Sequence, residues 1–465
     1  METGSGTYVF YDVETSGLSP EFDQIFQFAA IVTDADFNEI DTVDIRVKRR
    51  PHIVPAFGAL RTTGVDPLTI DRTNFTTYDL ASQLTEMFEG LKGATFIGYN
   101  SIRFDENFLR HLFYQNLRPI YQTQTGGNGR LDCLNLVSAT LATEPSALTF
   151  EINDKGRPNR RLESLAPLNG YAEHNAHDAL GDVRATIHIN KVIRQRCPEL
   201  WRQYQVSRTK HLFEDTLLSN TAVEVVNGFG KRRIISPICY AQDNQGFICF
   251  DHETCRATPE LGAQDWLQNF GKKKQTVFFR QRANTAEYIS PVKTGILPDG
   301  LSAREFEQTM SVLKTITANS DAISDLQLRE FESRRQFEMV DAVESKIYGG
   351  FPSAEDQRHM RDFHDVAPPD KMAVISQIED VRFKSLGIRL MAENWPAELT
   401  PEKLSAYSKW CADRAFSSEF GSGLLSEASR AREIAAAEET TGAAFAKSCV
   451  RFYDELLAGF QGQDT

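Results

Sequence analysis

Hydrophobic and polar positions follow two alternating periods up to about residue 200. Short apolar or alternating runs predict β-strands, and longer runs with apolar residues three to four positions apart predict helices. The expected strands are 7–13, 24–34, 39–47 and 95–99. The expected helices are 76–90, 104–115, 131–142 and 176–194. Residues 123–130, rich in glycine, are expected to form a flexible loop. This order of elements favours an α/β fold.

The pattern changes after about residue 200 to short β-rich segments separated by turn sequences such as Asn227-Gly228. These segments are 222–226, 233–240, 247–251, 276–280 and 288–292. They predict a small barrel or an open sheet, and the chain beyond Leu301 is predicted to be mostly helical. A chain of 465 residues is too long for one hydrophobic core. We therefore expect three domains, at residues 1–198, 199–350 and 351–465.

Composition narrows the class of protein without deciding it. Hydrophobic residues make up 41% and charged residues 25%, as in ordinary folded proteins. No apolar run approaches the roughly 20 residues that span a bilayer, and the first residues do not resemble a secretory leader. We therefore expect a cytoplasmic protein with no membrane partner. The seven cysteines are scattered without a Cys-x-x-Cys pair, which favours neither a disulfide framework nor a structural zinc site.

The net charge of −13 excludes a uniformly basic surface that coats nucleic acid. Any contact with nucleic acid must therefore be local. Basic residues do occur in clusters: Arg46, Lys48, Arg49 and Arg50; Arg157, Arg160 and Arg161; Lys231, Arg232 and Arg233; and Lys272, Lys273 and Lys274. Each cluster, taken alone, is better interpreted as a solvated face than as a binding site.

Two carboxylates interrupt the first predicted strand. Asp12 and Glu14 are two positions apart, so both side chains project from the same face of the strand. Adjacent carboxylates repel each other and lose hydration when they are partly buried, and a divalent cation with oxygen ligands relieves both costs. A strand that merely ends in a polar turn at residues 14–17 explains the pair equally well, so the metal interpretation depends on further residues.

Two more acids begin predicted helices. Asp105 is followed by Leu109 and Leu112 on its own helical stripe, and Asp182 likewise shares a stripe with isoleucines seven and eleven positions later. Both carboxylates should therefore point towards the core side. An aspartate in a first helical turn is also often only a cap or a partner of the helix dipole.

His177 lies five residues before Asp182, which on an ideal helix places the two side chains about 140° apart. The histidine must therefore lie in the turn that enters the helix if it is to reach the same site. Such a position suits a base that approaches a water molecule better than it suits a permanent ligand. The alternative is a surface histidine beside His174 and Asp178.

Together these four acids and one histidine form a set that structure alone would rarely tolerate. In order and spacing, three segments resemble the three exonuclease motifs of the DEDD-type 3′→5′ exonucleases. The segments are Phe10-Tyr11-Asp12-Val13-Glu14-Thr15-x-Gly17, Tyr99-Asn100-x-x-x-Phe104-Asp105 and Asn175-Ala176-His177-Asp178-Ala179-x-x-Asp182. The spacing of His177 and Asp182 is that of the histidine subtype.

Within that superfamily the chain most resembles the bacterial exodeoxyribonuclease I family. The resemblance rests on residues 23–31, 98–105 and 161–165, and on Tyr348-Gly349-Gly350-Phe351. It implies a ribonuclease-H-like exonuclease domain, a small SH3-like β-rich domain and a C-terminal helical domain. In this arrangement the second and third domains close a groove around single-stranded DNA.

The resemblance also implies a reaction, the hydrolysis of single-stranded DNA from its 3′ end to 5′-mononucleotides. Two Mg²⁺ ions, which Mn²⁺ could replace, would be held by Asp12, Glu14, Asp105 and Asp182, and His177 would act as the general base. The implied substrate contacts are Glu14, Arg161, Thr63-Gly64-Val65, Asn100 and Phe104. For Arg161 the alternative is a surface salt bridge with Glu163 or Glu173.

The family further implies a role in DNA repair and recombination near the bacterial nucleoid, with a single-stranded-DNA-binding protein as partner. A monomer is expected. Two alternatives stay open. Another enzyme of the superfamily, an exoribonuclease or a proofreading exonuclease, is possible because no residue is identified that reads a 2′-hydroxyl. A catalytically silent binding protein would be favoured by a missing acid, but all five motif positions are filled.

Overall fold

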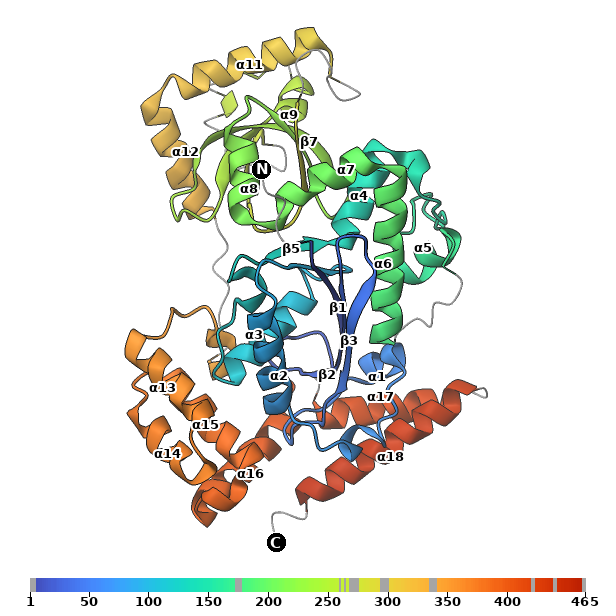
Figure 1. The fold of residues 1–465 in the computed structure, drawn as a ribbon, viewed down its shortest axis with the longest axis vertical. Coiled ribbons are helices and arrows are strands. Elements are labelled where there is room, and N and C mark those ends of the chain that lie inside the picture. Colours follow the sequence, from blue (N-terminus) through green and yellow to red (C-terminus); the bar gives the residue numbers. More distant parts are fainter. Residues whose placement is uncertain are drawn as a thin grey trace.

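A computed structural model describes residues 6–171, 178–258, 261–262, 265–266, 276–292, 301–333, 341–419, 423–437 and 441–461. Figure 1 shows three parts arranged along the long axis: a β-rich part at the top, a central sheet flanked by helices, and a group of helices below. The predicted α/β fold and its C-terminal helical region are confirmed.

The central sheet has five strands in the order β3-β2-β1-β4-β5. The strands are β1 (Tyr8–Thr15), β2 (Ile25–Thr33), β3 (Glu39–Arg46), β4 (Thr95–Gly98) and β5 (Gly129–Asp132). The first three form an antiparallel meander, whereas β4 pairs in parallel with both β1 and β5. β1 is therefore hydrogen-bonded along both of its edges.

The expected loop at residues 123–130 is wrong at its end, where Gly129 and Arg130 begin β5. Gly129 pairs with Thr95, and a Cβ atom on it would lie 2.8 Å from the carbonyl oxygen of Arg208. This glycine therefore permits a close approach of two backbones and does not provide flexibility.

Helices cover both faces of this sheet. On one face lie α2 (Thr77–Gly90), which begins with a Thr76–Asp79 capping box, and α3 (Asp105–Gln115). On the other lie α4 (Cys133–Thr143), α5 (Leu162–Leu168) and α6 (Ala179–Arg196). Side chains of β1 alternate between the two layers: Tyr11 packs with α2 and α3, and Phe10 with α4 to α6. Asp12 and Glu14 therefore emerge in the layer of α6.

The β-rich part is an antiparallel sheet in the order β10-β6-β7-β8-β9. Its strands are β6 (Val223–Val226), β7 (Arg232–Tyr240), β8 (Phe247–Asp251), β9 (Phe278–Gln281) and β10 (Tyr288–Pro291), and all five were predicted. The helices associated with it are α8 (Lys210–Leu218), α9 (His252–Arg256), α11 (Ala303–Thr317) and α12 (Ser320–Glu332). α7 (Pro198–Tyr204) connects it to the central sheet, because the Tyr204 hydroxyl bonds the carbonyl oxygens of Asp132 and Ala286.

The C-terminal helices are α13 (Ala354–Asp365), α14 (Pro368–Gln377), α15 (Val381–Asn394), α16 (Pro401–Phe416), α17 (Leu424–Ala437) and α18 (Thr441–Gln461). α13 to α15 bury an apolar cluster against Tyr114 and Leu117, at the C-terminal end of α3. α17 and α18 pack on α1 (Phe57–Thr63), beneath the central sheet in Figure 1. Within the described ranges, no helix has the length and apolar content needed to cross a membrane.

Short 3-10 helices connect several of these elements. They are η1 (Ile70–Arg72), η2 (Gln122–Gln124), η3 (Pro145–Ala147), η4 (Gln205–Arg208), η5 (Val343–Lys346) and η6 (Pro396–Glu398).

Candidate active site

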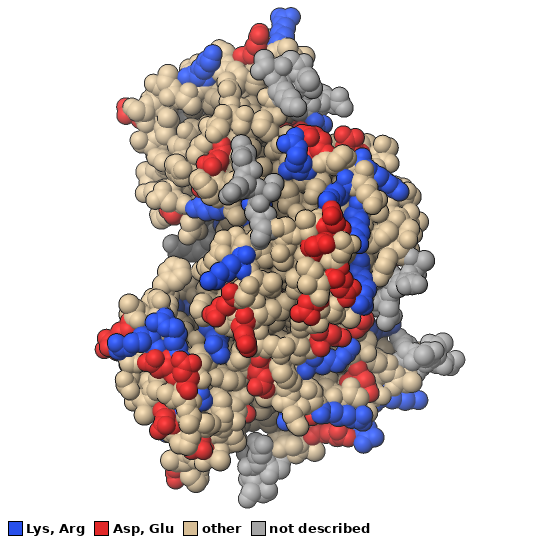
Figure 2. All heavy atoms as spheres, viewed as in Figure 1, with Lys and Arg blue, Asp and Glu red and all other residues tan. Residues whose placement is uncertain are grey.

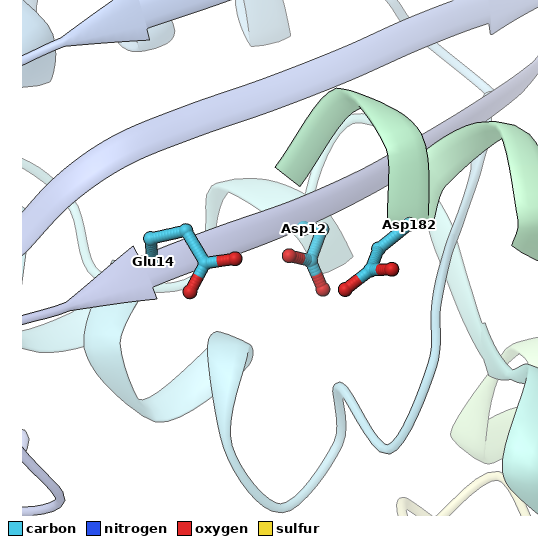
Figure 3. A group of neighbouring side chains, drawn as sticks. All are labelled: Asp12, Glu14 and Asp182. Atoms are coloured by element: carbon cyan, nitrogen blue, oxygen red, sulfur yellow. The ribbon is translucent and has the colours of Figure 1, made fainter. Parts of the chain in front are cut away.

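Three carboxylates meet where β1 passes the first turn of α6. Oxygen atoms of Asp12, Glu14 and Asp182 all lie within 4.8 Å of one another. Figure 3 shows the three carboxylates turned towards one another, two from the strand and one from the helix. Asp182 points this way because Ile189, on the same stripe of α6, is fully buried against the sheet. The orientations predicted for these three acids are confirmed.

Asp105 reaches the same region from the opposite layer. It opens α3 a few residues after β4, and it is 3% exposed. Its Oδ1 atom accepts a hydrogen bond from the backbone N–H of Val13 at 3.1 Å. Val13 lies between Asp12 and Glu14, so this bond ties the helix start to the middle of the acidic strand segment.

The acids raise one another's pKa values. Burial, and then the charges of Asp105, Glu14 and Asp182, raise the pKa of Asp12 well above its usual range. Burial and the neighbouring acids raise the pKa of Glu14 to about 8. Burial raises the pKa of Asp105 to about 7, although backbone N–H groups oppose the shift. The protein alone therefore holds these groups partly protonated at neutral pH, and a cation would restore their charge.

The donor set fits a hard divalent cation. Every group is a carboxylate oxygen donor, which is the ligand type that Mg²⁺ and similar ions prefer. Among the described residues, neither cysteine nor histidine joins the three carboxylates, as a zinc site of the structural type would require.

A second group of polar residues holds the entry of α6. Gln27 on β2 is paired in register with Glu14, and its side-chain amide donates to Asp178 at 3.3 Å. Arg46 forms an ion pair with Asp178 at 3.4 Å and lowers the pKa of Glu14 against the effect of burial. The sequence analysis did not find these roles. Gln27 is a polar residue within the otherwise apolar run 25–32, and this pattern could have indicated that its side chain has a polar partner.

His177 lies outside the described residues. The next residue, Asp178, is described, and its contacts with Gln27 and Arg46 place this end of α6 beside the carboxylates.

Asp132 is a further residue that the sequence analysis missed. It ends β5, and its carboxylate accepts backbone hydrogen bonds from Asn100 at 2.9 Å, Ile102 at 3.1 Å and Leu134 at 2.9 Å. Asn100 has a φ of 63°, a left-handed conformation that a non-glycine residue adopts only when its surroundings hold it. Asp132 therefore fixes the turn that leads from β4 to Asp105. It is also the N-cap of α4, where its side chain accepts from the backbone N–H of Leu134.

The other predicted substrate residues are placed as follows. Thr63 ends α1, Gly64 has a φ of 64° as its C-cap, and Val65 packs in the cluster with α17 and α18. The ring of Phe104, just before Asp105, lies 4.9 Å from that of Phe108. Arg161, at the start of α5, has a side chain that is 77% exposed and lies 3.6 Å from Glu163. The salt bridge considered for Arg161 is thus present.

Comparison with known proteins finds relatives over most of this chain. The family model described as Exonuclease matches residues 9–189, and the model described as Exonuclease I C-terminal domain matches residues 341–447. The chain is 28% identical over 430 residues to exodeoxyribonuclease I of Haemophilus influenzae, covering 87% of this chain and 89% of the relative. It is 27% identical over 450 residues to exodeoxyribonuclease I of Escherichia coli, covering 90% and 92%.

The chain belongs to the exodeoxyribonuclease I family. The fold agrees over almost the whole length with a solved member, the E. coli exonuclease I in complex with a dA16 oligonucleotide, at a TM-score of 0.85. That match covers 97% of this chain and all of the solved chain at 24% identity. The match to the exonuclease model spans Asp12, Glu14, Asp105 and Asp182.

Proposed function

We propose that this protein is a metal-dependent exonuclease that hydrolyses single-stranded DNA in the 3′→5′ direction to 5′-mononucleotides, in DNA repair and recombination. The observation that carries this proposal is the convergence of Asp12, Glu14 and Asp182, with Asp105 bonded to the same strand. The substrate class is supported by the relatives, which are named exodeoxyribonuclease I, and by the DNA oligonucleotide in the solved E. coli complex.

Four acids fit the proposed cofactor, two Mg²⁺ ions that Mn²⁺ could replace. Asp12, Glu14, Asp105 and Asp182 would hold them. When bound, such ions stabilise negative charge on the attacking and leaving oxygens of a phosphodiester and promote ionisation of water. One solved complex of the E. coli relative with single-stranded DNA is a zinc-bound form, which supports a divalent ion at this type of site.

Other residues would bind the substrate and move the proton. His177 would accept the proton of the attacking water. Arg161 would bind a phosphate through its two-pronged guanidinium, for which its exposure leaves room. Thr63-Gly64-Val65, Asn100 and Phe104 would hold the terminal nucleotide, with Glu14 as a further contact from the metal site.

Two adjoining cavities support a route for the strand between the central sheet and the β-rich part. One, of about 310 Å³, is lined by Arg103 and Asn107 near Asp105. The other, of about 340 Å³, is lined by Arg233 and Arg282 of the β-rich part. Both include Thr285 and Glu287, so the cavities share a wall. Figure 2 shows basic and acidic side chains interspersed on one face, so this face is not uniformly basic.

The remaining parts of the proposal follow the family. The three domains would be 1–198, 199–350 with an SH3-like fold, and 351–465, in a monomer of the bacterial cytoplasm close to the nucleoid. A single-stranded-DNA-binding protein is proposed as partner, since one solved structure contains SSB and exonuclease I with an inhibitor.

The proposal is tested with 5′-labelled single-stranded DNA and RNA of one sequence, digested with Mg²⁺ or EDTA. We expect wild type to shorten DNA from its 3′ end only with the metal, to act much less on RNA, and Asp12→Ala to be inactive. Asp41→Ala, which removes an exposed acid of β3, is the matched control and should keep full activity. Faster loss of RNA would assign a ribonuclease, and binding without shortening would assign a silent binding protein.

A further inference from the structure

A buried ion pair lies at the start of α3. Glu106, the residue after Asp105, is only 1% exposed, and Arg130 on β5 is 5% exposed. Arg130 donates from Nη1 to Glu106 Oε2 at 2.9 Å. The reaction proposed above gives neither residue a role.

Stability alone does not explain such a pair. Removing two charges from water costs about as much as their attraction returns, and apolar residues of similar volume often serve as well. Glu106 also lies in the first turn of α3, where an exposed acid would already interact favourably with the helix dipole. The burial of Glu106 against a charged partner therefore indicates a role other than stabilising the fold.

The Glu106 carboxylate is held by further groups. The Tyr11 hydroxyl donates to Oε1 at 3.0 Å, and the Thr123 hydroxyl donates to Oε2 at 3.0 Å. Arg110, one turn later on α3, lies 3.8 Å from Oε2 and has a second partner in the Tyr348 hydroxyl at 3.3 Å. Both carboxylate oxygens thus have a buried donor, so the side chain cannot rotate without losing a hydrogen bond.

Arg130 is fixed from two sides as well. Within the central sheet it is paired in register with Phe96 of β4. Its Nη2 atom donates to the carbonyl oxygen of Asn284, in the connection between β9 and β10, at 3.4 Å. The support of Glu106 therefore comes from the sheet and the β-rich part and not from α3 itself.

These contacts connect the neighbours of two proposed metal ligands. Tyr11 precedes Asp12 on β1, and Glu106 follows Asp105 on α3. Their hydrogen bond runs beside a second one, in which the backbone N–H of Val13 donates to Asp105 Oδ1 at 3.1 Å. Two hydrogen bonds, from the residues on either side of Asp12, therefore join β1 to the first turn of α3.

Asp105 is the acid for which such support matters. The carboxylates of the three-acid cluster come from β1 and α6, whereas Asp105 comes from α3, in the opposite layer. Successive side chains on a helix are about 100° apart, so any rotation of the first turn that displaces Glu106 also displaces Asp105. Holding Glu106 in place therefore holds Asp105 in place.

We propose that Glu106 and Arg130 are positioning residues for the metal site. Together with Tyr11 they fix the first turn of α3, so that Asp105 reaches the cations. The inference rests on the proposed function, in which Asp105 is a metal ligand. Neither residue would touch the cations or the DNA. Groups that orient metal ligands typically contribute about 10–100-fold to metal affinity or activity.

The first test replaces the ion pair by apolar residues. Glu106→Leu/Arg130→Met removes one charge of each sign, so the net charge is unchanged. We expect a urea-unfolding midpoint close to that of wild type, and an affinity for Mg²⁺, measured by calorimetry, that is lower by about 10–100-fold. Arg50→Met/Glu393→Leu replaces another buried ion pair, between the segment after β3 and α15, and should bind Mg²⁺ as wild type does.

The second test removes a single hydroxyl. Tyr11→Phe changes no charge and should fold, and its affinity for Mg²⁺ should fall by about tenfold, with a parallel loss of kcat. Binding of oligo-dT in EDTA should be unchanged, which separates a displaced ligand from a general loosening of the fold. Tyr8→Phe, on the same strand, is the matched control and should keep the Mg²⁺ affinity of wild type.

The outcomes separate this inference from the proposed function. Wild-type affinity for Mg²⁺ in the folded double variant or in Tyr11→Phe overturns the inference, as does an equal loss in the control variants. If the double variant does not fold, Tyr11→Phe decides alone. A wild type that binds Mg²⁺ but does not shorten DNA overturns the proposed function and leaves the inference standing, whereas a wild type that binds no Mg²⁺ overturns both.

Discussion

Arg50 and Glu393 form a two-pronged ion pair although they are 343 positions apart in the chain. Arg50 Nε and Nη2 lie 2.9 and 3.0 Å from the two carboxylate oxygens, and the side chains are only 7% and 6% exposed. Tyr407 donates a third hydrogen bond to Glu393 at 2.8 Å, and Gln115 accepts from Arg50. The pair joins the segment after β3 to α15, and so joins the central sheet to the C-terminal helices.

Removing one member of this pair should destabilise the protein strongly. We expect Glu393→Ala to lower the free energy of unfolding by about 3–5 kcal/mol, because it leaves the Arg50 charge buried without its partner. Replacing both residues, as Arg50→Met/Glu393→Leu, should cost less than the single change. Urea unfolding measures both. Glu199→Ala, in the exposed pair with Arg202, is the control and should have no measurable effect. Equal losses for Glu393→Ala and the control would contradict the prediction.

Binding of Mg²⁺ should release protons at pH 7. Burial raises the pKa of Glu14 to about 8 and that of Asp105 to about 7, so the metal-free site holds protons that a cation must displace. Affinity should therefore rise from pH 6 to pH 8, by up to about tenfold per pH unit for each proton, and level off above. Calorimetry in two buffers of different ionisation enthalpy measures the release. Asp12→Asn should abolish binding and Asp41→Asn should not. Binding that does not depend on pH would be evidence against this site.

His177→Asn should lower kcat by about 10²–10⁴-fold, the usual contribution of a general base. The stabilisation of the protein by Mg²⁺ in thermal unfolding should be unchanged, because the histidine is predicted to be no metal ligand. His174→Asn is the matched control. Unchanged kcat would make His177 a surface residue, and loss of the Mg²⁺ effect would make it a ligand.

Arg161→Ala should raise KM for single-stranded DNA with little change in stability. Its side chain is 77% exposed and its ion pair with Glu163 is a surface contact, so only the phosphate contact should be lost. The salt dependence of DNA binding should also weaken, with a slope smaller by about one. Glu163→Ala removes the same ion pair and keeps the guanidinium, so it should not raise KM. If both variants behave alike, the arginine has only its surface role.

Acid should destabilise the β-rich part through His252. This side chain is fully buried between the hydroxyls of Ser236 and Thr309, each at 2.8 Å, and burial lowers its pKa to about 4. The unfolded chain takes up the proton near pH 6.5 and the folded protein only near pH 4. Stability should therefore fall as pH is lowered from 6.5 to 4, by roughly 3 kcal/mol at most.

Urea unfolding at several pH values, in wild type and His252→Gln, measures this effect. The glutamine keeps the capacity for hydrogen bonds and does not titrate, so the variant should lose less stability over this range. Parallel pH profiles for the two proteins would rule out His252 as the cause.

The sequence predicted the acids of the site because their positions follow from local geometry. A period of two places Asp12 and Glu14 on one face, and a period of 3.6 directs Asp182 inwards, whatever the rest of the chain does. Asp132 could not be recognised in this way. Its partners Asn100 and Ile102 lie 30 to 32 residues earlier, and only the parallel pairing of β4 and β5 brings them together.

The basic clusters show the same limit. In sequence, Arg50 is one of four cations within five residues, but in the structure its charge is paired with Glu393. Arg160 bonds the carbonyl oxygens of Gly228 and Phe229, and Arg232 pairs with Glu224. Lys272, Lys273 and Lys274 lie outside the described residues. Whether a cation faces solvent or a buried partner depends on residues far away in the chain, which composition and spacing do not reveal.

Because β1 is paired on both edges, insertions and deletions within it are restricted more than substitutions elsewhere in the chain. Substitutions can alter the surface charge without moving a carboxylate. The number of residues in β1 cannot change in the same way. Inserting or deleting one residue before Asp12 would turn Asp12 and Glu14 into the apolar layer under α2 and α3. The same change would present hydrophobic side chains to α6. Descendants of this chain should therefore keep the number of residues between Tyr8 and Glu14.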